Sequence, residues 1–265
     1  MLTSLQNPLV KQLRKLQRAK ERVNQGVFLL EGTHLLQEAQ ATQQPLEVVC
    51  CTEEWQNRYP DLFAWAIGAA QRLEQVSPEV LKAIATTVEP DGVVATMPRL
   101  HTQAIDIQSL GLVLESIQDP GNLGTMIRTA AATATEGILV GGGSVDLENP
   151  KVLRASAGQW FRLPMQVIPQ HPVPQLPEVL RAYRDRGFQL VATLPTAKHS
   201  YWDVDFRQPT LVLMGNEGAG LSAELANLAT LPVRIPLAPG VESLNVAIAA
   251  ALVLYEAQRQ RQALA

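Results

Sequence analysis

The sequence predicts an α/β fold, because short apolar runs typical of strands alternate with amphipathic runs typical of helices along most of its 265 residues. The run at 210–214 (TLVLM) is apolar after its first residue, as in strands buried inside a sheet. A polar stretch with little periodicity, 99–109, interrupts the alternation. We therefore expect a small α/β domain at 1–98, a linker at 99–109 and a larger α/β domain at 110–265.

The first helix is expected to begin at Asn7 and Pro8, an N-cap residue followed by a first-turn proline. Leucines lie on one side of it. The other side carries cations at helical spacing, which are Lys11, Arg14, Lys15, Arg18 and Arg22. Such a stripe is either a solvated helix face or a surface that contacts nucleic-acid phosphates.

The rest of the first domain alternates between strands and helices. Strands are expected at 27–32, 46–51, 72–76 and 92–97, and helices at 33–40, at 60–70 and after Ser77-Pro78. Trp55, Tyr59 and Trp65 could stack on bases, but their helical spacing favours packing within the domain.

The second domain opens with a strand at 111–116, a turn at 119–122 and an amphipathic helix from Leu123. On this helix Arg128 shares a face with Gly124. Arg128 is either a surface or ion-paired residue, or it faces the cleft at the carboxyl end of the strand, where α/β proteins bind ligands.

Further strands are expected at 137–143, 164–169 and 188–194, with helices at 149–158 and 176–186. The glycines at the end of the first of these runs lack the GxGxxG spacing of a dinucleotide-binding turn. A nicotinamide-dependent oxidoreductase is therefore excluded.

Glycines gather where the strand at 210–214 ends. Gly215, Gly218 and Gly220 bracket Glu217, and Ser222 is a suitable N-cap for the next helix. The glycines permit close approach of backbone to a ligand, or they simply form a tight strand-to-helix turn.

The stretch 235–255 combines a site-like loop with an apolar helix. Gly240, Ser243 and Asn245 bring backbone freedom and hydrogen-bonding groups to the start of that helix. From Val246 to Tyr255 every residue is apolar or aromatic, so we expect the helix to be buried in a core, against a partner subunit, or both.

The composition sets broad limits on the class of protein. An apolar content of 46% is that of a globular protein, and the net charge of −3 does not by itself indicate a nucleic-acid partner. The adjacent Cys50 and Cys51 offer neither a disulfide framework nor a CxxC metal site. No signal peptide or apolar run of about 20 residues is present, so we expect a cytoplasmic protein. No metal is expected, because the histidines lack metal-site spacing; they are His34, His101, His171 and His199.

Three motifs occur in order at the ends of successive elements. They are Asn122-x-Gly124-x-x-x-Arg128, then Gly215-Asn216-Glu217-Gly218-x-Gly220-x-Ser222, then Ile235-Pro236 with Ser243-Leu244-Asn245-Val246. Together they resemble the SpoU (TrmH) family of RNA ribose 2′-O-methyltransferases, in the SPOUT superfamily. The N-terminal runs NPLVKQLRKL and FLLEGTHLLQEA are similar to the substrate-binding domain that many members place before the catalytic one.

The resemblance implies a parallel sheet closed by a C-terminal trefoil knot that holds S-adenosylmethionine, and a homodimer formed through the last helix. It implies RNA as substrate, with ribosomal RNA favoured over tRNA, and it makes the cation stripe a phosphate-contacting surface. The methyl donor would be held around Gly215, Gly220, Ile235, Gly240 and Leu244. The residues implied at the transfer site are Asn122, Arg128, Glu217, Ser243 and Asn245.

A guanidinium stays protonated in proteins, so Arg128 is unsuited to be a base. We expect Arg128 to orient a phosphate and stabilise the developing alkoxide, with Ser243 or the phosphate assisting deprotonation. Glu217 is expected to fix Asn122 or Arg128. Methylation of tRNA, or RNA binding without catalysis on the same scaffold, are the alternatives.

Overall fold

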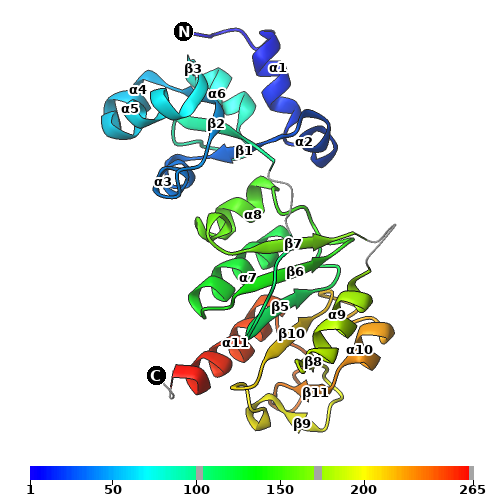
Figure 1. Ribbon diagram of the computed structural model, residues 1–265. Coiled ribbons are helices and arrows are strands. Elements are labelled where there is room, and N and C mark those ends of the chain that lie inside the picture. Colours follow the sequence, from blue (N-terminus) through cyan, green and yellow to red (C-terminus); the bar gives the residue numbers. More distant parts are fainter. Residues whose placement is uncertain (100–103, 170–174, 263–265) are drawn as a thin grey trace. The chain divides into compact units, whose positions relative to one another are not determined.

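The computed structural model describes residues 1–99, 104–169 and 175–262, and its chain divides into two compact units (Figure 1). Unit 1 comprises Met1–His101 and Asp146–Arg162, and unit 2 comprises Thr102–Val145 and Leu163–Ala265. Each unit is built on one sheet with helices, so the predicted α/β fold is confirmed. Part of the expected linker, residues 100–103, lies outside the described residues. The same is true of two of the histidines, His101 and His171.

A mixed four-stranded sheet forms the centre of unit 1. Its strands are β1 (Val27–Glu31), β2 (Leu46–Cys51), β3 (Ala70–Gln75) and β4 (Val93–Pro98). The strand order is β1-β4-β2-β3, with β1 and β2 antiparallel to β4 and β3 parallel to β2. The helices of unit 1 are α1 (Pro8–Lys15), α2 (Ala19–Gln25), α3 (Thr33–Ala41), α4 (Glu53–Arg58), α5 (Pro60–Ala69), α6 (Pro78–Ile84), α8 (Pro150–Ala155) and η1 (Gln159–Phe161).

The N-terminal helix that the sequence predicts as one is two helices, α1 and α2. Between them Arg18 is extended, with φ −100° and ψ 133°. The Arg22 guanidinium donates to the carbonyls of Leu16 and Gln17 at 2.9 and 3.2 Å, and to Asp146 at 2.6 Å. Because Arg22 is only 1% exposed, its predicted place on the cationic face is wrong; it instead satisfies carbonyl groups that the helix break leaves free.

The segment Asp146–Arg162 lies within unit 1 although its sequence falls between two strands of unit 2. It is joined to the N-terminal part of the unit by four arginine–carboxylate pairs, Arg22–Asp146, Arg99–Glu148, Arg154–Glu31 and Arg162–Glu38. The rings of Phe28 and Trp160 also pack with their centroids 5.3 Å apart. The segment therefore packs against β1 as part of unit 1.

Unit 2 contains a seven-stranded sheet in which every pairing is parallel. Its strands are β5 (Leu110–Leu114), β6 (Gly137–Gly141), β7 (Met165–Ile168), β8 (Gln189–Thr193), β9 (His199–Ser200), β10 (Thr210–Met214) and β11 (Leu231–Arg234). They follow the order β7-β6-β5-β10-β8-β11-β9. β5 and β10 are fully buried, as their apolar sequences predict.

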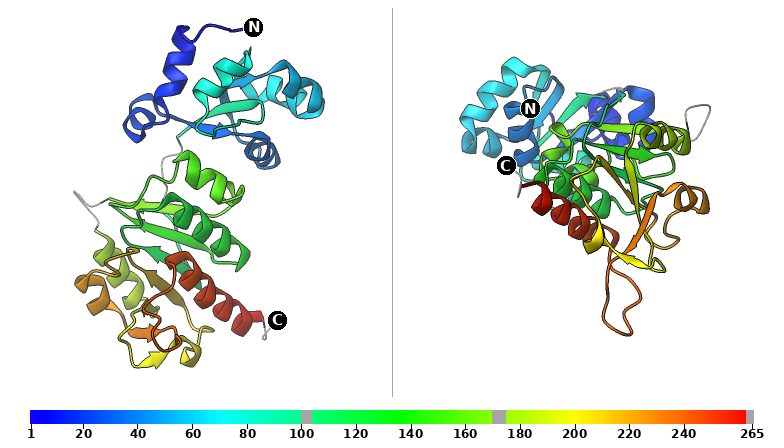
Figure 2. Two further views of the ribbon diagram at one scale, coloured as in Figure 1. Left: turned by 180° about the vertical axis from the view of Figure 1, so that it is seen from behind. Right: turned by 60° about the horizontal axis from the view of Figure 1, so that its bottom comes forward.

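Helices cover both faces of the unit 2 sheet (Figure 1). They are α7 (Pro120–Ala132), α9 (Leu176–Asp185), η2 (Tyr201–Asp203), α10 (Ala223–Leu228) and α11 (Val246–Gln262). α7 and α11 pack against each other on one face, and α9 and α10 pack together on the other. The loop at 235–245, between β11 and α11, projects from unit 2 (Figure 2, right).

Candidate functional site

Two loops at the carboxyl ends of the neighbouring strands β5 and β10 meet around the carboxylate of Glu217. This carboxylate accepts hydrogen bonds from the backbone N–H groups of Gln118 and Asp119 at 3.1 and 3.0 Å. It also accepts from the side-chain amide of Asn122 at 3.1 Å. Partial burial acts to raise the pKa of Glu217, but these donors together outweigh it and lower the pKa below its ordinary value. A carboxylate stabilised in this way orients its neighbours and is a poor proton acceptor.

Asn122 connects the other two motifs. Its Oδ1 accepts from the side-chain amide of Asn245 at 2.9 Å. Asn245 Oδ1 in turn accepts from the backbone N–H groups of Ala247 and Ile248, the first turn of α11, at 2.9 and 3.3 Å. The structure thus joins Glu217, Asn122 and Asn245, which stand far apart in the sequence, in one chain of hydrogen bonds.

A cavity of about 690 Å³, including its open mouth, lies beside this network. Its walls are formed by the ends of β8 and β10, the loop after β10, the loop before α11 and the first turn of α11. The lining residues are Thr193, Leu194, Pro195, Met214, Gly215, Asn216, Glu217, Gly220, Leu221, Ile235, Leu237, Glu242, Ser243, Leu244, Val246 and Ala249. Most of these side chains are apolar, so the cavity suits a ligand with an apolar part and a few polar groups.

Gly215 is fixed by a close approach of backbone to backbone. A Cβ built there would lie 2.2 Å from the carbonyl carbon of Gly220 and from the nitrogen of Leu221. The loop closes through paired hydrogen bonds between Asn216 and Gly220, both 2.9 Å, and Gly220 has φ +71°. Of the residues predicted to hold the donor, Gly215, Gly220, Ile235 and Leu244 line the cavity.

Gly240 is the exception among the residues predicted to hold the donor, since it does not line the cavity. It has φ +85° in the turn closed by the hydrogen bond from Val241 N–H to the Ala238 carbonyl, on the exposed part of the projecting loop.

Two residues that line the cavity, Thr193 and Leu194, were not predicted from the sequence. Only their position at the end of a predicted strand could have indicated them.

Ser243 and Arg128 stand outside the hydrogen-bonded network. Ser243 lines the cavity, and its hydroxyl has no hydrogen bond to any residue that the structure describes. Arg128 is exposed on α7 and has no ion pair or hydrogen bond within the described part of the chain. Every other arginine of unit 2 has such a partner; they are Arg181, Arg184, Arg186, Arg207, Arg234, Arg259 and Arg261. Arg128 is therefore free to bind an anionic ligand.

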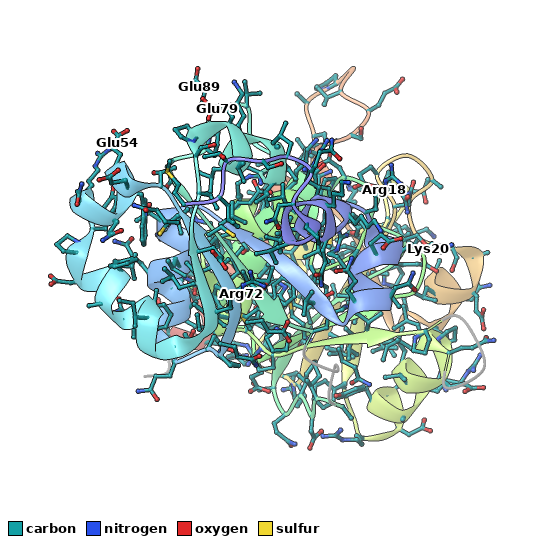
Figure 3. All side chains as sticks on the ribbon, turned by 90° about the horizontal axis from the view of Figure 1, so that it is seen from above. Arg18, Lys20, Glu54, Arg72, Glu79 and Glu89 are labelled. Atoms are coloured by element: carbon teal, nitrogen blue, oxygen red, sulfur yellow. The ribbon has the colours of Figure 1, made fainter. Side chains whose placement is uncertain are left out.

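The cationic face of unit 1 is formed by the exposed side chains Lys11, Arg14, Lys15 and Arg18. None of the four forms an ion pair with a described residue. Figure 3 shows Arg18, with Lys20 beside it, well apart from Glu54 and Glu79 in the same unit. The acidic residues labelled there therefore do not pair with this face.

A profile described as the SpoU rRNA Methylase family matches residues 109–255, which is more than half of the chain. The chain belongs to this family. Residues 7–95 match a second profile, the MRM3-like substrate binding domain. Both resemblances predicted from the sequence are confirmed.

Similar proteins cover almost the whole chain. It is 49% identical to an uncharacterized tRNA/rRNA methyltransferase of Synechocystis over 99% of the chain and 94% of the relative. It is 31% identical to the 23S rRNA (guanosine(2553)-2′-O)-methyltransferase RlmP of Bacillus subtilis, over 96% and 97%. The crystal structure of the SpoU methyltransferase AviRb of Streptomyces viridochromogenes with AdoMet superposes with a TM-score of 0.84 at 30% identity, covering 97% of this chain and 99% of that one.

Two features of other protein classes are not found in the described residues. No helix there is both long and apolar enough to cross a membrane. No group of three or more His, Cys, Asp or Glu side chains there is placed to hold a metal ion.

Proposed function

We propose that this protein transfers a methyl group from S-adenosylmethionine to a ribose 2′-hydroxyl of ribosomal RNA. The observation that carries the proposal is the hydrogen-bonded chain Glu217–Asn122–Asn245, which joins all three family motifs beside the cavity. The names of the relatives support the reaction and the substrate class.

The cavity fits S-adenosylmethionine. Apolar side chains such as Leu194, Leu221 and Ile235 suit an adenine ring, and Gly215 lets the backbone of Gly220 and Leu221 pass close by to form one wall. The carboxylates of Glu217 and Glu242 among the lining residues suit a cationic ligand. When bound, S-adenosylmethionine supplies a methyl group on a positively charged sulfur. The trefoil knot, which would form part of this cavity, stays a prediction.

The chemistry needs an activated hydroxyl, because a ribose 2′-hydroxyl is a very weak acid. The unpaired guanidinium of Arg128 binds the phosphate of the target nucleotide and stabilises negative charge that develops on the 2′-oxygen. The proton of the 2′-hydroxyl passes to that phosphate, either directly or by way of the Ser243 hydroxyl, which has no described partner. Glu217 holds Asn122 in place and takes no proton.

The cationic face of unit 1 binds the RNA backbone, because Lys11, Arg14, Lys15 and Arg18 are exposed and unpaired. Phosphate contacts of this kind add affinity and fix orientation but do not read sequence. Ribosomal RNA is the proposed substrate because the Bacillus subtilis relative, which aligns over 96% of the chain, unit 1 included, is named for 23S rRNA. We place the activity in the cytoplasm.

A second copy of the chain covers the outer side of α11. Ile248, Leu252 and Tyr255 are 52%, 38% and 53% exposed, and their spacing of four and three residues puts them on one face of the helix. These apolar side chains are the part of the predicted all-apolar helix that the chain itself does not bury. Leu252→Glu should halve the mass measured by light scattering, whereas an unchanged mass would contradict this dimer.

The test of the proposed reaction uses the purified protein, methyl-labelled S-adenosylmethionine, and either ribosomal RNA or tRNA. Methylation at the 2′-oxygen leaves the neighbouring phosphodiester resistant to alkali, so labelled dinucleotides should survive hydrolysis of the ribosomal RNA. Label in tRNA alone would support the tRNA alternative. Binding of RNA without transfer to either substrate would support a non-catalytic role.

A further inference from the structure

Glu115, the first residue after β5, joins the two ends of the glycine-rich loop 215–222. Its backbone N–H donates to the carbonyl of Met214 at 2.9 Å, immediately before the loop. Its side-chain Oε2 accepts from the backbone N–H of Ser222 at 2.7 Å, where the loop ends. Glu115 therefore forms hydrogen bonds at both the N-terminal and the C-terminal end of the loop.

The interior of this loop is held by its own hydrogen bonds. Asn216 and Gly220 pair through their backbones, and Asn216 Oδ1 accepts from the N–H groups of Gly218 and Ala219, both at 2.9 Å. Such a closed turn keeps its shape, so contacts with neighbouring segments decide how it is oriented against the cavity.

The two halves of the loop have different anchors. The first half is held by Asn216, which donates to the Ser116 carbonyl at 2.8 Å, and by Glu217. In the second half, Gly220 and Leu221 line the cavity. Among the described residues, the hydrogen bond from Ser222 to Glu115 is the one that ties this half to another loop.

We propose that Glu115 is a positioning residue for the methyl-donor cavity, which it shapes by fixing Ser222 and hence the wall formed by Gly220 and Leu221. The proposal rests on the proposed function, since it takes S-adenosylmethionine as the ligand of that cavity. Glu115 acts through the loop and does not line the cavity itself.

Three substitutions separate the reach of the side chain from its charge. Glu115→Gln keeps an oxygen acceptor at the same distance without the charge, Glu115→Asp keeps the charge but is one methylene too short, and Glu115→Ala removes both. Ser222 is exposed, so water can replace the lost acceptor and the fold should survive each change.

A matched control lies at the opposite end of β5. There the Glu136 carboxylate accepts from the backbone N–H groups of Gln108 and Ser109 at 2.6 and 3.0 Å. Glu136→Ala removes two bonds of the same type in the same unit, but far along the strand from the cavity. It reports what the loss of a carboxylate–backbone contact does to stability alone.

Binding of S-adenosylmethionine is measured by calorimetry, and transfer to ribosomal RNA gives KM and kcat. Glu115→Ala and Glu115→Asp should raise the dissociation constant and KM for the donor about tenfold, as for one hydrogen bond to a charged acceptor. They should leave kcat at saturating donor nearly unchanged. Glu115→Gln should stay within about threefold of the natural protein, since a neutral acceptor keeps roughly half the strength of such a bond. Glu136→Ala should lower the melting temperature without changing donor affinity.

The outcomes separate this inference from the function on which it rests. If the natural protein binds no S-adenosylmethionine, the proposed function fails. If it binds the donor, and Glu115→Ala and Glu115→Asp bind it equally well, the positioning role is overturned while the function stands. The positioning role would also be overturned if Glu115→Asp bound S-adenosylmethionine with full affinity while Glu115→Gln bound it weakly. The charge of the side chain, and not its length, would then matter.

Discussion

The substitution Gly215→Ala tests whether the cavity depends on the close approach of two backbone segments. A Cβ at this position would lie 2.2 Å from two backbone atoms of Gly220 and Leu221, whereas ordinary contacts begin at 3.4 Å. The difference, 3.4 minus 2.2, is 1.2 Å, and backbone atoms cannot rotate away as a side chain can. The wall of the cavity must therefore move by about that amount, at a cost of roughly 1–3 kcal/mol for overpacking.

Gly218→Ala is the matched control in the same loop, since a Cβ there would meet only Asn216 Oδ1, at 3.7 Å. If this cost falls on the wall that contacts the donor, Gly215→Ala should weaken donor binding roughly 10- to 100-fold, since about 1.4 kcal/mol corresponds to tenfold, and Gly218→Ala should bind normally. Calorimetry with S-adenosylmethionine and thermal melting measure the two effects. Equal affinity of both variants would refute the assignment of the donor to this cavity.

Three further predictions concern transfer, RNA affinity and stability. Arg128→Ala should bind S-adenosylmethionine normally but lose about 10²–10³-fold in kcat, the usual effect of removing an oxyanion donor; unimpaired single-turnover transfer would contradict its role. Lys15→Glu with Arg18→Glu should weaken RNA binding and reduce the salt slope by roughly 0.7–0.9 per lost phosphate contact, and an unchanged slope in filter-binding titrations would place the RNA elsewhere. Burial raises the pKa of Glu148 from 4.5 to about 7, despite the opposing effect of Arg99. The native state then binds more protons than the unfolded state between these pH values, so stability falls as pH rises through this window. Glu148→Gln should remove that part of the decline in melting temperature. If melting temperature falls with pH equally in the two proteins between pH 5 and 8, the prediction is contradicted.

The sequence predicted the alternation of strands and helices and the three motifs, because both depend on local patterns. It also predicted that Glu217 would fix Asn122 or Arg128, and the hydrogen bond from Asn122 to Glu217 agrees with the first of these. The cavity could be predicted only in part, since Thr193 and Leu194 belong to no motif and reach it through the order of strands in the sheet.

The differences between prediction and structure arise from contacts across long sequence separations. The helical spacing of Arg22 could not reveal that Asp146 would hold it inside unit 1. The break before Ala19 is likewise decided by tertiary contacts, since Gln17 donates to the carbonyls of Ile84 and Ala85 at 3.0 and 3.1 Å. Hydrophobic periodicity does not record partners of this kind.

Methylation of ribosomal RNA by this protein is tested most directly by a map of 2′-O-methyl groups in ribosomal RNA and tRNA from cells with and without the protein. One ribosomal RNA ribose should lose its methyl group when the protein is absent, and an intact copy should restore it whereas the Arg128→Ala variant should not. A ribosomal RNA map that is the same in both cells, or a loss confined to tRNA, would contradict this prediction.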